Sequence, residues 1–173
     1  MDYRTQIPTY VGLNDRRINV VCEIPNGTVN KYEIDEVTGE YVKIVRTLSK
    51  KYPYIYNYGF IPQTLEEDGD QLDAIIIADE EIAPLTVLQC SVIGVIKTID
   101  NGEQDDKILV IPTYSTKKSI NLKKILKYLR NYKYPNQKGT EIGDVLDANE
   151  AYILIDKAME RLINSQINRG VKK

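Results

Sequence analysis

Three aspartates, Asp68, Asp70 and Asp73, stand directly before the apolar run Ala74–Ile77. A short apolar run of this kind is typical of a buried strand, so the carboxylates are expected at the mouth of that strand. Packed together they repel one another, and each one carries a large desolvation cost if it is buried alone. A hard divalent cation such as Mg²⁺ takes oxygen ligands and would balance them. The sequence therefore favours a cation-binding loop that leads into a core strand.

Two simpler interpretations compete with a cation-binding loop. An acidic surface turn is common, and an isolated pattern of three spaced aspartates is only moderately specific. An EF-hand calcium loop does not fit, because counting from Asp68 places Leu72 at position 5 and Asp73 at position 6, where glycine is required. The rest of the chain has to decide between a surface turn and a metal site.

Composition indicates an ordinary globular chain. Its 173 residues are 42% hydrophobic and 28% charged, which is enough for one domain, residues 1–173, with a real core. No apolar stretch is long enough to span a bilayer, and the first residues lack the apolar core of a signal peptide. Cys22 and Cys90 lie in apolar runs and are expected to be buried free thiols in a reducing cytoplasm.

The residue types narrow the chemistry. The chain contains no histidine, which excludes Ser-His-Asp and Cys-His nucleophilic machinery and the H-E-x-x-H zinc site. Hydrolysis would have to use carboxylates, lysine, tyrosine or a metal-activated water. A net charge of −2 argues against nucleic acid as the main partner, because binding to phosphate backbones needs a basic surface.

The first two-thirds of the chain predict β-structure. Strands are expected over residues 17–24, 29–34, 41–46, 74–78, 86–99 and 107–111. Thr38–Glu40 separates two of them and predicts a hairpin, and the run over 86–99 is long enough for a bent strand. Short strands at this spacing predict a small closed or nearly closed barrel.

The last third predicts two helices. Four leucine and isoleucine residues at i, i+3, i+4 and i+7 spacing share one helix face: Leu122, Ile125, Leu126 and Leu129. Asp147–Glu150 has the form of a capping box. A second apolar stripe follows it: Ala151, Leu154, Ile155, Ala158, Leu162 and Ile163. Both stripes are expected to pack against the barrel.

Several polar segments are unremarkable when each is taken alone. Lys31 and Glu33 share one face of a predicted strand and can face solvent or line a polar cavity. Tyr54–Pro62 is rich in tyrosine, and most of its rings are expected to be packing residues. Asp100–Lys107 has the composition of a solvated hairpin turn, and Lys133 stands where a helix dipole favours a cation.

The order of these segments along the chain is far more specific than any one segment alone. The blocks are E-I-P, K-Y-E-I-D, R, Y-x-x-N-Y-G-F-I-P, D-G-D-Q-L-D, D-x-x-x-x-D-x-K and Y-K. From about Val20 to Lys133 this order resembles the family I (soluble) inorganic pyrophosphatases of prokaryotic type, whose shorter members have a similar length. The resemblance implies an α+β, mainly β fold, with an OB-like five-stranded barrel and flanking helices. It also implies metal-dependent hydrolysis of inorganic pyrophosphate to two orthophosphates by direct attack of a metal-activated water, without a covalent intermediate.

The resemblance also implies roles for individual residues. Asp70 matches the proposed acceptor of the proton from the attacking water. Metal-binding positions are matched by Asp68, Asp73, Asp100, Asp105 and Glu33. Phosphate-binding positions are matched by Lys31, Arg46, Tyr58, Tyr132 and Lys133. Other active-site positions are matched by Glu23, Tyr54 and Lys107. Several Mg²⁺ ions per subunit are implied, with Mn²⁺ or other divalent ions as substitutes, together with a homo-oligomer that is a hexamer if the chain is bacterial.

Two positions depart from the family pattern. Gln71 stands where the family usually has proline, and Asn101 stands where bacterial relatives often have glutamate. Neither change removes an expected inner-sphere ligand. Two other functions remain open at this point. One is a non-catalytic OB-type module that binds nucleic acid through its tyrosines, and the other is a metal-dependent phosphatase acting on nucleotides or longer polyphosphates.

Overall fold

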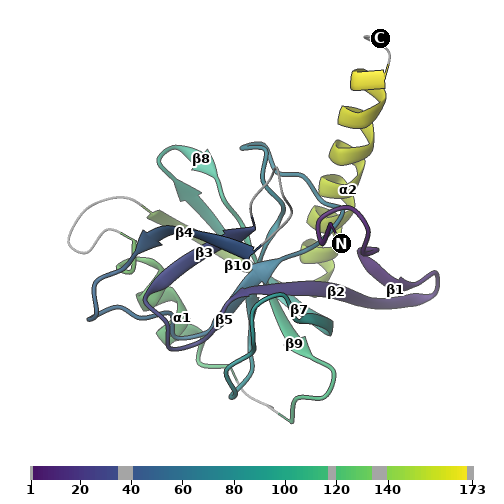
Figure 1. Cartoon of the computed structure of the whole chain (residues 1–173). Helices are drawn as coiled ribbons and strands as arrows, with labels where there is room; N and C mark the ends of the chain where they lie inside the picture. Colours follow the sequence, from purple (N-terminus) through teal and green to yellow (C-terminus); the bar gives the residue numbers. More distant parts are fainter. Residues whose placement is uncertain (1, 35–40, 117–119, 134–139, 171–173) are drawn as a thin grey trace.

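Figure 1 shows the computed structural model of the chain, in which residues 2–34, 41–116, 120–133 and 140–170 are described. The strands, in chain order, are β1 (Tyr10–Gly12), β2 (Asp15–Ile24), β3 (Asn30–Ile34), β4 (Tyr41–Thr47), β5 (Asn57–Phe60), β6 (Asp73–Ile76), β7 (Val87–Asp100), β8 (Glu103–Gln104), β9 (Lys107–Pro112) and β10 (Thr140–Leu146). The helices are α1 (Leu122–Leu129) and α2 (Ala148–Gly170).

Five strands close into a ring. β2 pairs with β5, β5 with β6, β6 with β9, β9 with β7, and β7 again with β2. The β6–β9 pair is parallel and the other four are antiparallel. β1 extends the sheet beside β2, whereas β8 and β10 pair with β7. The predicted closed barrel is therefore confirmed, and it has the OB-like arrangement that the resemblance implied.

The predicted strands inside the ring are found with their ends shifted by a few residues. The ranges 17–24, 74–78, 86–99 and 107–111 correspond to β2, β6, β7 and β9. β7 is bent as predicted, with a register shift between Val92 and Gly94 in its pairing with β9. β3 and β4 form a separate two-stranded antiparallel sheet. The turn predicted over Thr38–Glu40 lies outside the described residues. β1, β5, β8 and β10 were not predicted.

Because side chains alternate along each strand, the buried residues form two clusters, one against each helix. Ala74 and Ile76 of β6 belong to the cluster that includes buried residues of α2, whereas Ile75 belongs to the cluster that includes buried residues of α1. α1 buries Ile125 and Leu129, as its spacing predicted. α2 buries Ala151, Ile155 and Ala158. The barrel thus has one helix on each side, and both predicted stripes supply core contacts.

The stripe on α2 ends earlier than predicted. Ile163 is 53% exposed, so its assignment to the core was wrong. Figure 1 gives the reason, because the C-terminal part of α2 projects beyond the barrel and meets no strand there. At the other end, the carboxylate of Asp147 accepts hydrogen bonds from the backbone N–H groups of Asn149 (2.8 Å) and Glu150 (3.1 Å), which caps the helix as predicted. Neither α1 nor α2, as far as these helices are described, is both long and apolar enough to cross a membrane.

Candidate active site

A polar cavity of about 220 Å³ opens where the acidic loop meets the ends of several strands. Eleven of the predicted site residues line it: Lys31, Arg46, Tyr54, Tyr58, Asp68, Asp70, Asp73, Asp100, Asp105, Tyr132 and Lys133. They come from β3, β4 and β7, from β5 and the segment before it, from the acidic loop and the first residue of β6, and from the segments after β8 and α1. The fold therefore gathers residues that lie up to 102 positions apart (133 − 31) into one cavity.

The acidic loop is a tight turn that carries two of the aspartates. The Glu66 N–H donates to the Asp70 carbonyl at 2.7 Å, and Gly69 adopts a φ of +96°, which a residue with a side chain rarely accepts. The Asp68 carboxylate accepts from the Asp70 N–H at 3.0 Å. Burial, together with the carboxylates of Asp68 and Asp73, raises the pKa of Asp70. The turn therefore holds like charges close together, which is the condition that favours a bound cation.

A buried lysine connects the loop to the next strand of the barrel. Asp73 is paired in register with Lys107 across the parallel strands β6 and β9, and the Lys107 ammonium lies 2.6 Å from Asp73 Oδ2. The same ammonium pairs with Asp105. The Tyr58 hydroxyl donates to Asp73 Oδ2 at 2.5 Å. Lys107 is only 1% exposed, so its charge is compensated within the protein.

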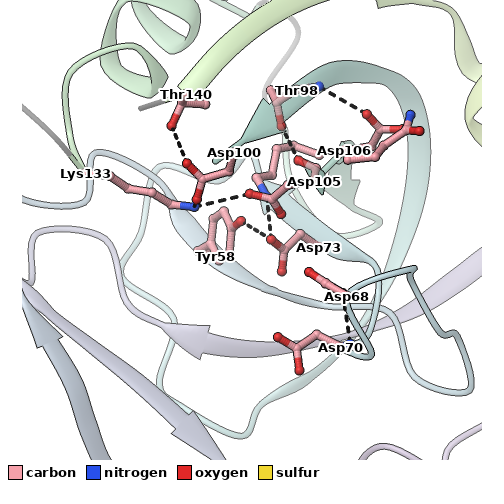
Figure 2. Close-up of polar contacts among 12 residues, drawn as sticks. Tyr58, Asp68, Asp70, Asp73, Thr98, Asp100, Asp105, Asp106, Lys133 and Thr140 are labelled. Atoms are coloured by element: carbon pink, nitrogen blue, oxygen red, sulfur yellow. Dashed lines mark hydrogen bonds and ion pairs between the residues drawn. The ribbon is translucent and has the colours of Figure 1, made fainter. Parts of the chain in front are cut away.

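A second lysine joins the carboxylates on the far side of the cavity, as Figure 2 shows. The Lys133 ammonium lies 2.8 Å from Asp100 Oδ2 and 3.2 Å from Asp105 Oδ2. Burial alone would raise the pKa of Asp105, but the ammonium groups of Lys107 and Lys133 hold it below its ordinary value. The Thr140 hydroxyl donates to Asp100 Oδ1 at 3.3 Å. Asp105 is therefore an ionised carboxylate with two cationic neighbours.

The tyrosines form a packed aromatic wall. Tyr54 meets Tyr58 and Tyr132 with ring centroids 6.2 and 5.8 Å apart. Burial, together with the Asp73 carboxylate, raises the pKa of Tyr58 well above its ordinary value. Burial also raises the pKa of Tyr132. Both phenols are therefore protonated at neutral pH. The Tyr58 hydroxyl already donates to Asp73, whereas the Tyr132 hydroxyl can donate to an anion in the cavity.

The remaining predicted residues lie beside or beneath this cavity. Glu23 and Glu33 line a neighbouring space of about 90 Å³ that also reaches Asp70 and Asp73. Lys31 pairs with Glu33 at 2.7 Å, as expected for two residues on one face of a strand. Burial and the Asp73 carboxylate raise the pKa of Glu23 to about 8. Lys107 lies beneath the cavity, so the structure brings every predicted site residue into one region.

Four further charged residues in this region were not predicted. Glu66, Glu103 and Asp106 line the main cavity, and Arg4 lines the neighbouring one. Asp106 accepts hydrogen bonds from the Thr98 N–H (3.1 Å) and from Gln104 (2.9 Å), and it also pairs with a lysine of β7. These contacts fix the β7–β8 turn. Glu66, Glu103 and Asp106 stand near predicted aspartates in the sequence, but nothing there distinguishes them, and Arg4 precedes every recognisable block.

The donor set fits a hard divalent cation. The side chains that could bind a metal here are carboxylates, and Mg²⁺ prefers oxygen ligands. Within residues 2–34, 41–116, 120–133 and 140–170, no three acidic or cysteine side chains already surround one point at metal-binding distance. Lys107 and Lys133 instead bridge Asp73, Asp100 and Asp105. The residues therefore fit such ions by donor chemistry and charge.

Comparison with known proteins decides the family. The sequence model described as inorganic pyrophosphatase matches residues 20–163, which is most of the chain. The chain belongs to the inorganic pyrophosphatase family. It is 38% identical over 153 residues to the inorganic pyrophosphatase of Synechocystis sp., covering 83% of this chain and 90% of that protein. It is 36% identical over 165 residues to the soluble inorganic pyrophosphatase of Oryza sativa subsp. indica, covering 90% of this chain and 76% of that protein.

A solved structure supports the same assignment. The crystal structure of an inorganic pyrophosphatase from Neisseria gonorrhoeae matches with a TM-score of 0.82 and 34% identity, covering 91% of this chain and 97% of that one. Family membership confirms the predicted resemblance, the predicted OB-like fold and the predicted reaction, which is hydrolysis of inorganic pyrophosphate. The relatives named here are pyrophosphatases, which favours an enzyme over a nucleic-acid-binding module.

Proposed function

We propose that this pyrophosphatase hydrolyses pyrophosphate with several Mg²⁺ ions and with Asp70 as the general base. The observation that carries the proposal is a single cavity in which the carboxylates of the acidic loop face the cations Lys31, Arg46 and Lys133. Carboxylates of this kind can hold metal ions, whereas lysine and arginine can bind the oxygens of a phosphate. The cavity therefore has separate groups for the metal and for the substrate.

The metal-binding residues in this proposal are all carboxylates: Asp68, Asp73, Asp100, Asp105 and Glu33. Bound Mg²⁺ neutralises phosphate charge and lowers the pKa of a water molecule toward neutrality. Mn²⁺ and other divalent ions would fit the same oxygen donors, because such sites select poorly by affinity alone. Glu23 supports this set from the neighbouring cavity, where it stands close to Asp73.

Asp70 is well placed to receive the proton of the attacking water. Its carboxylate lines both the main cavity and the neighbouring one, and its pKa is raised by burial and by Asp68 and Asp73. A base with a raised pKa holds the transferred proton better than an ordinary aspartate does. No nucleophilic side chain takes part, because the water attacks phosphorus directly.

The cationic and tyrosyl side chains orient the substrate. Lys31, Arg46 and Lys133 bind outer phosphate oxygens, and their charges stabilise the negative charge that develops on the departing phosphate. Tyr58 and Tyr132 stay protonated at neutral pH. Tyr132 can therefore donate a hydrogen bond to the substrate, and Tyr58 can do so by turning its hydroxyl away from Asp73. Tyr54 holds both of their rings, and Lys107 holds Asp73 and Asp105. Positioning and electrostatics then supply most of the rate enhancement, as in phosphoryl transfer generally.

Phosphate release is the direct test. Purified protein is assayed with pyrophosphate, tripolyphosphate, ATP and a phosphomonoester, each with excess Mg²⁺ and with EDTA. We expect rapid, EDTA-sensitive release from pyrophosphate, and equal release from the other substrates would favour the broader phosphatase. Asp70→Asn should lower kcat by about 10²-fold or more, whereas Asp144→Asn, at an exposed position on β10, should not. A folded Asp70→Asn enzyme with normal turnover would exclude Asp70 as the base.

The assembly and the compartment complete the proposal. We propose one domain over residues 1–173, a cytoplasmic homo-oligomer that is a hexamer if the source is bacterial, and no nucleic-acid or membrane partner. Cys22 and Cys90 are buried free thiols, which suits a reducing compartment. The net charge of −2 disfavours binding to nucleic acid. Light scattering coupled to size-exclusion chromatography tests the assembly, and a single-stranded DNA titration tests the partner.

A further inference from the structure

α2 reaches the active site indirectly. Among the described residues that line the main cavity, none belongs to α2. Arg161 of this helix nevertheless contacts the start of the acidic loop. Its Nη1 donates to the Leu65 carbonyl at 2.7 Å and lies 3.7 Å from Glu66 Oε2. Its Nη2 lies 3.5 Å from Glu67 Oε1. One guanidinium therefore contacts three consecutive residues.

The backbone at Leu65 is attached to α2 twice. Its N–H donates to the Ala158 carbonyl at 3.1 Å, and its own carbonyl accepts from Arg161. A guanidinium suits this position because it is planar, always charged and carries several donors in a fixed arrangement. Lysine has one compact ammonium and cannot reproduce the whole set. The contact therefore depends on arginine, not simply on positive charge.

The attached segment is the base of the turn that carries Asp68 and Asp70. The Glu66 N–H donates to the Asp70 carbonyl at 2.7 Å, which closes the turn beside Arg161. The sequence from Glu66 to Asp73 contains no proline, so no ring restricts φ in this loop. The restraint comes instead from hydrogen bonds within the turn, such as that from the Asp70 N–H to Asp68, and from contacts outside the loop.

Arg161 also holds a carboxylate at the edge of the cavity. The Glu66 side chain lines the cavity and is only 13% exposed. Without Arg161, this buried carboxylate would lose its cationic neighbour and would be free to turn toward the other acidic groups. Loss of this ion pair, or movement of the Glu66 side chain, would disturb the placement of Asp68 and Asp70 relative to Asp73.

We propose that Arg161 is a positioning residue for the acidic loop. Through Leu65 and Glu66 it fixes the turn so that Asp68 and Asp70 face the cavity in the arrangement that receives metal and water. This inference rests on the proposed function, because it assigns Asp68 and Asp70 their metal-binding and proton-accepting roles. Arg161 itself does not line the main cavity.

The test compares Arg161→Met and Arg161→Lys with Lys157→Met. Lys157 is exposed on the same helix, so its replacement removes one positive charge without touching the loop. Mg²⁺ binding is measured by isothermal titration calorimetry without pyrophosphate, and kcat and KM are then measured across a Mg²⁺ series. Arg161→Met should weaken Mg²⁺ binding about 10-fold, in the range seen when outer-shell partners are removed. Arg161→Lys should recover part of this loss, and Lys157→Met should bind as the wild type does.

The outcomes separate this inference from the proposed function. Pyrophosphatase activity of the wild type tests the function, whereas the ratio of Mg²⁺ affinities between variants tests Arg161 without substrate. A folded Arg161→Met protein that binds Mg²⁺ as tightly as the wild type would overturn the positioning role. Should Arg161→Met fail to fold, Arg161→Lys and Glu66→Gln provide the comparison, and unchanged Mg²⁺ binding in both would overturn it equally.

Discussion

The Lys107 ammonium lies 2.6 Å from Asp73 Oδ2 because the two residues are register partners on the parallel strands β6 and β9. The pairing of these strands therefore fixes the position of a carboxylate that belongs to the acidic loop. Since Lys107 is buried and also pairs with Asp105, the barrel and the site share one set of ionic contacts. Changes to these contacts should alter stability as well as activity.

Removal of the buried ammonium should destabilise the protein strongly. In Lys107→Met, Asp73 and Asp105 lose a shared cation inside the protein, and breaking a buried ion pair of this kind typically costs about 3–5 kcal/mol. We expect a value near the lower end, because Tyr58 still donates to Asp73 and Lys133 still pairs with Asp105. Urea unfolding in EDTA measures the loss.

The control for this prediction is Lys123→Met, which removes a lysine at an exposed position on α1. Its stability should stay within about 0.5 kcal/mol of the wild type. Added Mg²⁺ should recover part of the stability of Lys107→Met, because a cation again balances the carboxylates. Equal unfolding midpoints for Lys107→Met and the wild type in EDTA would contradict the prediction.

The stability of the folded protein at acidic pH should depend on Asp105. Its pKa lies below the ordinary value of 3.8 because Lys107 and Lys133 outweigh the effect of burial. A carboxyl group with a lowered pKa in the folded state stabilises the protein above its unfolded pKa and loses that contribution as the pH falls. In EDTA, wild type should therefore exceed Asp105→Asn by a constant margin above about pH 5. The margin should narrow below pH 3.8.

Urea unfolding of both proteins between neutral pH and about pH 3 measures this margin. Asp144→Asn, at an exposed position, serves as the control for removal of one carboxylate. A margin that stays constant through the whole acid range would show that Asp105 does not contribute through its ionised form. A margin that widens as the pH falls would have the wrong sign for a lowered pKa.

Gly59 should be indispensable to ring closure. It lies in β5, and a Cβ at this position would come within 1.9 Å of the Val21 carbonyl oxygen on β2. Because the obstacle is backbone, no side-chain rotation can relieve it. Gly59→Ala should cost more than about 3 kcal/mol, in the range of severe overpacking. Thermal melts would measure it, with Gly12→Ala as control, since the nearest atom to its added Cβ is 3.8 Å away. Equal melting temperatures for the two variants would refute the prediction.

Local periodicity made the central part of the fold predictable. β2, β6, β7 and β9 are apolar strands with turn residues near their ends, and α1 and α2 carry apolar residues at helical spacing. β5 was missed because Asn57–Phe60 is short and mixed in character, although all four residues are buried. Its strand geometry comes from its neighbours β2 and β6. β10 was missed because Gly143 and Asp144 interrupt its apolar residues where the register shifts.

In the site, too, residues in local sequence patterns could be predicted, whereas contacts between residues far apart in the sequence could not. Asp68, Asp70 and Asp73 were recognisable because they precede an apolar strand, and the order of the other blocks supplied the remaining candidates. The contact between Arg161 and Leu65 joins residues 96 positions apart, and no short pattern marks either of them. Likewise, nothing near Ile163 in the sequence shows that α2 has left the barrel by that point.

The two thiols should be inert in the folded protein. Burial raises the pKa of Cys22 and of Cys90 from 9.0 to about 12, with Glu23 adding to the effect at Cys22. A thiol pKa that is higher by about 3 (12 − 9.0) lowers the thiolate fraction about 1,000-fold at neutral pH. Only the thiolate reacts appreciably. Burial also blocks access to both sulfurs.

Native protein should therefore react with Ellman's reagent at least about 1,000-fold more slowly than the same protein in guanidinium, where two thiols per chain should titrate. Activity should survive the native treatment, because neither cysteine lines the main cavity or the neighbouring one. The absorbance of the coloured thiolate that the reagent releases gives the rates for the native and the denatured protein. A free cysteine peptide provides the reference for an exposed thiol. Fast reaction of one equivalent in the native state would show that β2 or β7 opens readily, since these two strands carry the cysteines and pair with each other across the closure of the ring.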